Sequence, residues 1–136
     1  MSVPDKVLET FFRRAIINFK KIQTIRFREG RSDWQWSTFE TTPKMSTYLV
    51  SFLISDLEYL TPRQNNTNSD RNVVYRFWSR HDVLYKTRYA MRIAPLMKNY
   101  LENLFDVRDV LPKHDFVALP SFVSTALENW GLYSFA

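Results

Sequence analysis

One carboxylate of this chain has an unusual sequence setting. Glu128 lies within the apolar and aromatic stretch Ala126-Leu-Glu-Asn-Trp-Gly131, near residue 136 at the end of the sequence. Burying an unpaired carboxylate costs several kcal/mol, so this side chain either faces water or holds a cation. From these residues alone both interpretations stay open.

Few other residues offer reactive chemistry. The sequence has no cysteine and two histidines, His81 and His114, which lie far apart. These counts exclude disulfides, thiolate zinc sites, cysteine nucleophiles and a multi-histidine metal site within the chain. His114 precedes Asp115, and a neighbouring pair of this kind usually makes a polar contact at the surface. No serine lies in a G-x-S-x-G elbow, and no carboxylate pair has the arrangement of a glycosidase.

Composition narrows the function classes further. Only two glycines occur, where average usage would give about nine or ten. Glycine-rich phosphate loops of the Walker and Rossmann types are therefore excluded. Residues 1–44 hold nine Lys or Arg against five Asp or Glu. Because no nucleic-acid motif accompanies this basic excess, we expect no nucleic-acid partner.

The apolar residues do not suggest a membrane span. The longest apolar run, Tyr48–Ile54, is far shorter than the ~20 residues that cross a bilayer. Residues 1–5 lack the basic region and apolar block of a secretory signal. Membrane contact is expected only through residues 5–28, as a basic amphipathic helix, or through an anchor outside this chain. A helix packed into a core is the alternative for residues 5–28.

Periodicity predicts two helices. Apolar residues at steps of three and four favour a helix over Pro4–Arg28, although the alternation in Gln23–Arg28 also fits a strand. A second helix is predicted from Asp82 to Phe105, with Asp82 as its N-cap and a kink at Pro95.

Alternating polar and apolar residues predict several strands, separated by a polar loop over residues 61–70 that is the best candidate for a domain boundary. The predicted strands are Trp34–Phe39, Met45–Ile54, Asn72–Trp78, Asp115–Pro120 and Ala126–Phe135. Strands combined with one long helix indicate an α+β fold.

Three blocks of sequence resemble the gluzincin zinc aminopeptidases, the aminopeptidase N family. Leu111-Pro-Lys-His-Asp115, an apolar strand and Thr125-Ala-Leu-Glu-Asn-Trp-Gly131 are similar to the family's Leu-Pro-Lys-x-Asp block and its exopeptidase motif Gly-Ala-Met-Glu-Asn-Trp-Gly. Upstream, Thr42–Asp56 resembles the strand that closes the family's N-terminal β domain. Tyr89–Pro95 resembles the first helix of its catalytic domain. The blocks occur in the family's order.

The resemblance implies a division of the chain. Residues 38–70 correspond to the end of the N-terminal β domain. Residues 71–136 correspond to the N-terminal part of a thermolysin-like catalytic domain, with strands and one long helix. Residues 1–37 stay unassigned. The chain is thus expected to be an internal piece of a longer protein. The resemblance implies a location either at the plasma membrane or outside the cell, or in the cytoplasm.

The resemblance also implies substrate-binding roles. The carboxylate of Glu128 would bind the free α-ammonium of a peptide, by the strong, charge-assisted kind of hydrogen bond. The backbone of Ala126 and Leu127 would lie alongside the substrate as an added strand. Asn129 would help to hold the loop. The implied partners are peptides with a free N-terminus.

Three positions depart from the family pattern. Thr125 replaces the first glycine of the exopeptidase motif, which adds a side chain where backbone approaches substrate. Leu127 replaces methionine, a change that nearly conserves volume. Asp106 stands where the family commonly has glycine.

The catalytic half of the family's chemistry is missing from this sequence. Family members use zinc held by H-E-x-x-H and a further glutamate, with the first glutamate as general base. No such motif occurs in these residues. The resemblance therefore implies a metalloaminopeptidase, while this chain alone supplies no catalytic residue, no metal ligand and no expected cofactor. The alternative is a non-catalytic peptide-binding or interaction protein derived from the family.

Overall fold

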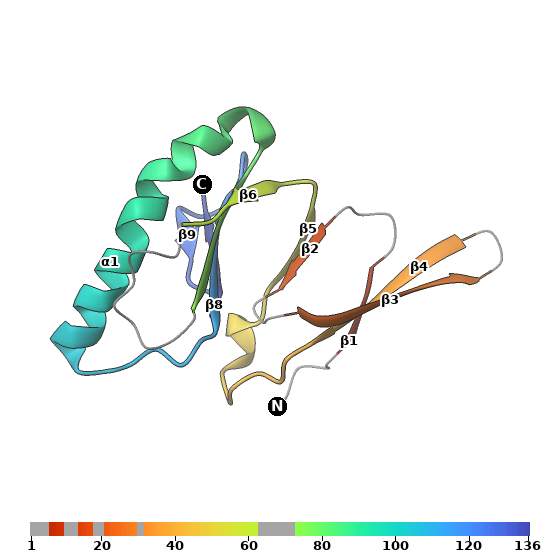
Figure 1. Cartoon of the computed structure of the whole chain (residues 1–136), viewed down its shortest axis with the longest axis horizontal. Coiled ribbons are helices and arrows are strands. Elements are labelled where there is room, and N and C mark those ends of the chain that lie inside the picture. The colour runs from red at the N-terminus through yellow and green to blue at the C-terminus, as the bar shows by residue number, and fades with distance from the viewer. Residues whose placement is uncertain (1–5, 10–13, 18–20, 30–31, 63–72) are drawn as a thin grey trace.

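The computed structural model describes residues 6–9, 14–17, 21–29, 32–62 and 73–136. In these residues the chain forms a five-stranded sheet with a long helix along one face, and two smaller sheets further from the helix (Figure 1). The fold is mixed α+β, as the sequence predicts.

The five-stranded sheet has the strand order β6-β7-β8-β10-β9. Its three inner strands, β7, β8 and β10, run parallel, and the outer strands β6 and β9 are antiparallel to their neighbours. The bounds are β6 Glu58–Leu60, β7 Val74–Ser79, β8 Lys113–Ala118, β9 Ala126–Leu127 and β10 Leu132–Phe135. The predicted strands at residues 72–78 and 115–120 are confirmed within small shifts. The predicted strand at residues 126–135 is two strands separated by a turn.

The connection between β7 and β8 carries the predicted helix. A 3₁₀ helix, His81–Thr87, leads into α1, Arg88–Phe105. The prediction of Asp82 as a helix cap is wrong, because Asp82 lies inside the 3₁₀ helix and its Oδ2 accepts a hydrogen bond from Arg80 Nη2 at 2.9 Å. Pro95 is buried within α1, which continues past it, and the kink there stays a prediction.

Side-chain alternation gives the sheet two different faces. Aromatic residues of β7, β8 and β10 face α1, among them Phe77, Phe116 and Tyr133. On the opposite face Trp78, Val117 and Leu132 form the buried core with Leu57, and Leu53 and Leu119 pack against it. The core thus lies on the face of the sheet opposite α1, where Leu53 of β5 (Phe52–Ser55) packs against it.

The helix predicted over Pro4–Arg28 is wrong in the described residues, which form strands. Lys6–Glu9 (β1) and Lys21–Glu29 (β3) flank Ser32–Phe39 (β4) in a three-stranded sheet. Arg14–Ile17 (β2) pairs antiparallel with Phe52–Ser55 (β5). The alternation in Gln23–Arg28 was the better indicator, since pairing with β4 outweighs local helical spacing. The described residues between 5 and 28 therefore do not form the amphipathic helix on which the expected membrane contact depended.

The long strand predicted at Met45–Ile54 is only partly right. Thr47–Leu49 forms a 3₁₀ helix, and the strand β5 begins at Phe52. The prediction of a strand at Trp34–Phe39 is confirmed by β4.

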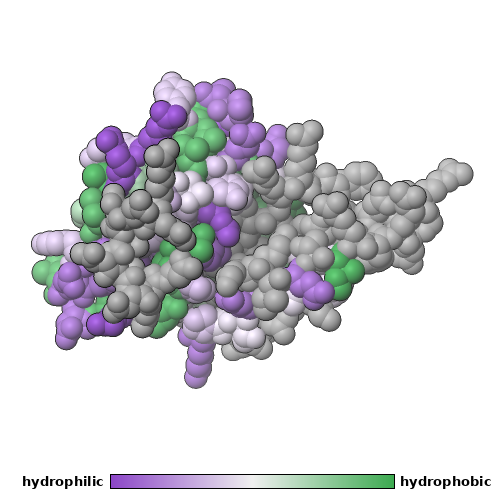
Figure 2. Space-filling model, viewed as in Figure 1, coloured by the Kyte–Doolittle hydropathy of each residue, from purple (hydrophilic) through white to green (hydrophobic). Residues whose placement is uncertain are grey.

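Helix α1 is amphipathic but also presents apolar side chains to solvent. Leu96, Tyr100 and Leu104 are each more than half exposed. Figure 2 shows apolar residues among polar ones on the side of the molecule where the helix lies. No helix in the described residues is both long and apolar enough to cross a bilayer.

Candidate functional site

A tight turn carries the candidate site from β9 into β10. The Leu132 N–H donates a hydrogen bond to the Asn129 carbonyl at 3.0 Å, and Gly131 has φ of 73°. A positive φ at the third position of such a turn is what a type II turn requires, and glycine adopts it without steric cost. One of the chain's two glycines therefore shapes the turn that follows Glu128.

The side chain of Asn129 ties this turn to a distant segment. Asn129 is buried, and its Nδ2 donates a hydrogen bond to the Tyr48 carbonyl at 3.1 Å. Tyr48 lies in the 3₁₀ helix before β5, so the bond joins the turn to the polypeptide preceding the five-stranded sheet. The family resemblance implies a loop-holding role for Asn129, and the bond to Tyr48 is the contact through which Asn129 could act.

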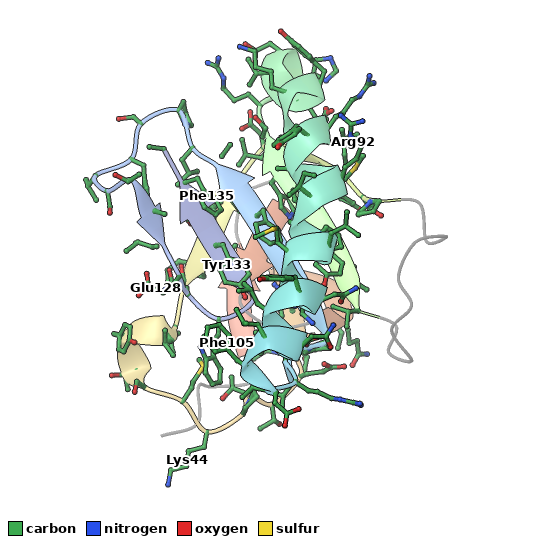
Figure 3. The ribbon with its side chains drawn as sticks, turned by 90° about the vertical axis from the view of Figure 1, so that its left-hand side faces the viewer. Lys44, Arg92, Phe105, Glu128, Tyr133 and Phe135 are labelled. Carbon is green, nitrogen blue, oxygen red and sulfur yellow. The ribbon has the colours of Figure 1, made fainter. Side chains whose placement is uncertain are left out.

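Glu128 lies exposed at the edge of the sheet. Figure 3 shows it beside β9 and near the 3₁₀ helix Thr47–Leu49, while Phe105 marks the end of α1. Among the described strands β9 is the last in the sheet order, with β10 on one side. The side chains of Ala126 and Leu127 are exposed as well. An anion therefore stands at the end of a short strand whose outer edge has no strand against it in the described residues.

A buried ion pair lies under the turn. Lys113 and Asp115 are 2% and 1% exposed, and the Lys113 Nζ is 2.5 Å from Asp115 Oδ2. The same Nζ donates to the Gly131 carbonyl at 3.0 Å. Trp78 Nε1 donates to Asp115 Oδ1 at 2.8 Å, and Arg76 Nη1 lies 3.5 Å from that oxygen. Burial lowers the pKa of Lys113 below its ordinary value, against the attraction of Asp115.

Sequence reasoning missed the pair, although a signal was present. Lys113 and Asp115 are two positions apart on a strand, so their side chains lie on the same face. Both belong to the Leu-Pro-Lys-x-Asp block that carries part of the family resemblance.

The prediction of a surface contact between His114 and Asp115 is wrong. Adjacent residues on a strand point to opposite faces, and His114 faces α1 with 3% of its surface exposed. Its Nε2 lies 2.7 Å from Asp109 Oδ2, and its Nδ1 lies 3.1 Å from Tyr133 Oη. Burial raises the pKa of Asp109, but the contact with His114 and the hydrogen bond from the Leu111 N–H outweigh it and lower the pKa overall.

Curated relatives of this chain are aminopeptidases, although no family model matches it. Aminopeptidase Q of Homo sapiens is 41% identical over 124 residues, which cover 89% of this chain and 12% of the relative. Aminopeptidase N of Haemonchus contortus is 39% identical over 107 residues, covering 79% of this chain and 10% of the relative. This chain belongs to the aminopeptidase N family.

Several different aminopeptidases match most of this chain, but the matched region is only a small part of each of them. Endoplasmic reticulum aminopeptidase 2 of Bos taurus is 34% identical over 121 residues, which cover 89% of this chain and 12% of the relative. The chain thus spans about a tenth of the length of these three aminopeptidases.

The departures from the aminopeptidase N pattern have identifiable places in the structure. Asp106 follows α1 in the left-handed conformation, with φ of 51° and ψ of 36°, and its N–H donates to the Glu102 carbonyl. The glycine common in the family suits this position without steric cost. Thr125 is exposed, and its carbonyl accepts a hydrogen bond from the Ala136 N–H at 3.1 Å.

The family's zinc does not fit the residues described here. Within the described ranges no group of three or more His, Asp or Glu side chains is arranged to hold a metal ion. His114 contacts Asp109, while the exposed His81 has its Nδ1 2.9 Å from Glu58 Oε2. The hydrogen bond to Glu58 raises the pKa of His81. No metal ligand is therefore assigned among the residues that the structure describes.

Proposed function

We propose that this chain supplies the substrate-amine recognition element of a zinc aminopeptidase, with Glu128 binding the α-ammonium of a peptide. The observation that carries the proposal is an exposed carboxylate at the end of the edge strand β9, directly before a turn that is held from two sides. A fixed anion can replace the water that an ammonium loses on binding, and charge-assisted hydrogen bonds are the strong kind.

The backbone of β9 would orient the rest of the peptide. An extended chain can add to an exposed sheet edge through main-chain hydrogen bonds, and β9 offers Ala126 and Leu127 for this. With the peptide's N-terminus held at Glu128, cleavage by a catalytic centre at a constant distance would remove one residue at a time. Specificity for a free N-terminus follows from the charge of Glu128.

The domain division is part of the same proposal. Residues 38–70 would form the end of an N-terminal β domain, and residues 71–136 the start of a thermolysin-like catalytic domain. The hydrogen bond from Asn129 to Tyr48 then joins these two parts directly beside the amine-binding carboxylate. The zinc ligands and the general base of the enzyme would be supplied by residues outside this chain, so binding and hydrolysis are separable here.

Peptide binding tests the proposal. Two short peptides of identical sequence, one with a free and one with an acetylated N-terminus, carry a fluorophore at the C-terminus, and binding is followed by anisotropy. The free peptide should bind about tenfold more tightly or better, the value of one hydrogen bond to a charged group. Glu128→Gln should remove this difference while leaving binding of the acetylated peptide unchanged.

A matched control separates a local effect from a change in net charge. Asp82 is also exposed, but it bonds to Arg80 before helix α1. Asp82→Asn changes the charge as Glu128→Gln does and should leave the preference for the free peptide intact. Equal binding of both peptides by the unsubstituted chain contradicts the proposal.

A non-catalytic peptide-binding protein derived from the family is the second candidate. It is favoured by the presence of Glu128 together with the absence of any metal-holding group among the described residues. It predicts the same peptide preference. A protein containing this chain that prefers free N-termini but shows no zinc-dependent hydrolysis would establish it over the aminopeptidase.

A further inference from the structure

We infer that the buried ammonium of Lys113 is a positioning group for the turn that presents Glu128. It fixes the direction of the Gly131 carbonyl, and with it the orientation of the turn. This inference rests on the proposed function for the role of Glu128, but its structural part can be tested separately.

The contacts of Lys113 reach both the sheet and the turn. Its Nζ lies 2.5 Å from Asp115 Oδ2 within the same strand, β8, and donates to the Gly131 carbonyl at 3.0 Å. That carbonyl also accepts the Asp115 N–H at 3.0 Å, the main-chain bond that begins the pairing of β8 with β10. One carbonyl of the turn thus receives two donors from β8.

Asp115 in turn is held by the neighbouring strand. Trp78 Nε1 donates to its Oδ1 at 2.8 Å, and Arg76 lies within ion-pair distance of the same oxygen. Both residues belong to β7, so the ammonium of Lys113 cannot shift without breaking contacts that extend across three strands. The ammonium that bonds to the Gly131 carbonyl is therefore held directly by Asp115 on β8 and, through Asp115, by Trp78 and Arg76 on β7.

Stability alone is a poor explanation for this pair. A buried ion pair can often be replaced by apolar residues of similar volume with no loss of stability, because desolvation of the charges offsets their attraction. An apolar replacement could not bond to the Gly131 carbonyl, however. The feature that only a side-chain donor supplies here is orientation of the turn.

The turn is short enough to transmit this orientation. Glu128 directly precedes the turn formed by residues 129–132, which contains Gly131 and is closed by the bond from the Leu132 N–H to the Asn129 carbonyl. The Asn129 side chain holds the same turn from the side of Tyr48. The turn is thus bonded to Lys113 of β8 and, through Asn129, to the Tyr48 carbonyl, and the two contacts together restrain the backbone that follows Glu128.

Three variants test the inference. Lys113→Met removes the charge and the donor at nearly constant length, and Lys113→Gln keeps an N–H donor without the charge. The control is Lys98→Met. Lys98 pairs with Glu102 on the same helix, α1, and with Asp109 in the loop before β8, so this variant removes two ion pairs away from the turn. Each is compared with the unsubstituted chain for the ratio of affinities for free and acetylated peptide, and for hydrogen exchange at the Asp115 and Leu132 amides.

We expect Lys113→Met to lower the affinity ratio and to speed exchange of the two amides, relative to amides of α1, by about fivefold, the equivalent of one net hydrogen bond. Lys113→Gln should retain most of the ratio, because the carbonyl keeps a donor. Lys98→Met should change neither readout. A purely structural role would accelerate exchange in α1 and the turn alike and leave the ratio unchanged.

The outcomes separate the two proposals. If the unsubstituted chain shows no preference for the free peptide, the proposed function fails, and the exchange of the two amides still decides whether Lys113 positions the turn. Unchanged exchange and an unchanged ratio in Lys113→Met overturn the inference. If Lys113→Met does not fold, the test rests on Lys113→Gln. A folded Lys113→Gln that has lost all preference for the free peptide overturns the inference, because a side-chain donor at position 113 would then not be enough to position the turn.

Discussion

The side-chain amide of Asn129 donates a hydrogen bond to the main-chain carbonyl of Tyr48 at 3.1 Å, across 81 positions of sequence. Because Asn129 directly follows Glu128, this bond couples the packing of the two segments to the position of the candidate amine-binding carboxylate.

Replacing the donor of this bond should loosen the site. Asn129→Asp puts a carboxylate oxygen against the Tyr48 carbonyl, so a hydrogen bond is lost and a partly buried charge is left unpaired. We expect a loss of about 1–3 kcal/mol in the free energy of unfolding, measured by urea denaturation. The same change at the exposed Asn103 on α1 is the control and should alter stability little. Equal effects at both positions would show that the Tyr48 bond contributes nothing.

The residue after α1 offers a stabilising substitution. Asp106 has a left-handed conformation, with φ of 51°, which costs an L-residue of this type more than glycine. Asp106→Gly should raise the free energy of unfolding by about 0.5–1 kcal/mol, measured as a shift in the urea midpoint. Asp106→Ala, which loses the tolerance of Asp for this conformation, should lower it. A stability order with alanine above glycine would contradict the assignment of strain to this position.

Acid should weaken the loop between α1 and β8. Hydrogen bonds from Lys98 and the Asp109 N–H lower the pKa of Glu102 below its ordinary 4.5. The pKa of Asp109 is likewise below its ordinary 3.8, because its hydrogen bonds outweigh the effect of burial. Carboxylates with depressed folded-state pKa values stabilise the fold above their ordinary values, and this contribution is lost as pH falls through the folded-state values.

The urea midpoint should therefore decrease as pH is lowered from about 5 through 4 and below. Lys98→Met should lower stability at neutral pH by about 1 kcal/mol or less, and the difference from the unsubstituted chain should shrink in acid as its partners become protonated. Lys44→Met, at an exposed lysine (Figure 3), should give no pH-dependent difference. A gap for Lys98→Met that stays constant down to acid pH would contradict this account.

The chain by itself should not hydrolyse peptides. Within the described residues no His, Asp and Glu side chains gather into a metal-holding group, and the sequence contains no H-E-x-x-H. Incubation of the chain with an amino-acid amide that releases a fluorophore should give no signal above buffer, with zinc or without it. Zinc-dependent activity that a chelator removes would show that the ligands had been missed.

The family, helix α1 and several strands could be predicted from the sequence. The motif around Glu128 and the Leu-Pro-Lys-x-Asp block are contiguous, and a contiguous motif can be recognised without a structure. Strong local patterns likewise predicted α1, β4, β7 and β8. The N-terminal strands could not be predicted in the same way, because residues 6–29 have apolar spacing that fits a helix, and only pairing with β4 and β5 decides for strands.

The sequence by itself determined the family, through contiguous motifs, and showed that no H-E-x-x-H occurs in these residues. The resemblance made Glu128 the candidate for binding an amine. The tertiary structure decided how that carboxylate is held. Lys113 and Asp115 look like ordinary charges in the sequence. They become a buried pair beneath Gly131 because β8 lies between β7 and β10 in a parallel arrangement. Contacts between strands that are distant in sequence depend on register and sheet order, and neither can be read from local periodicity.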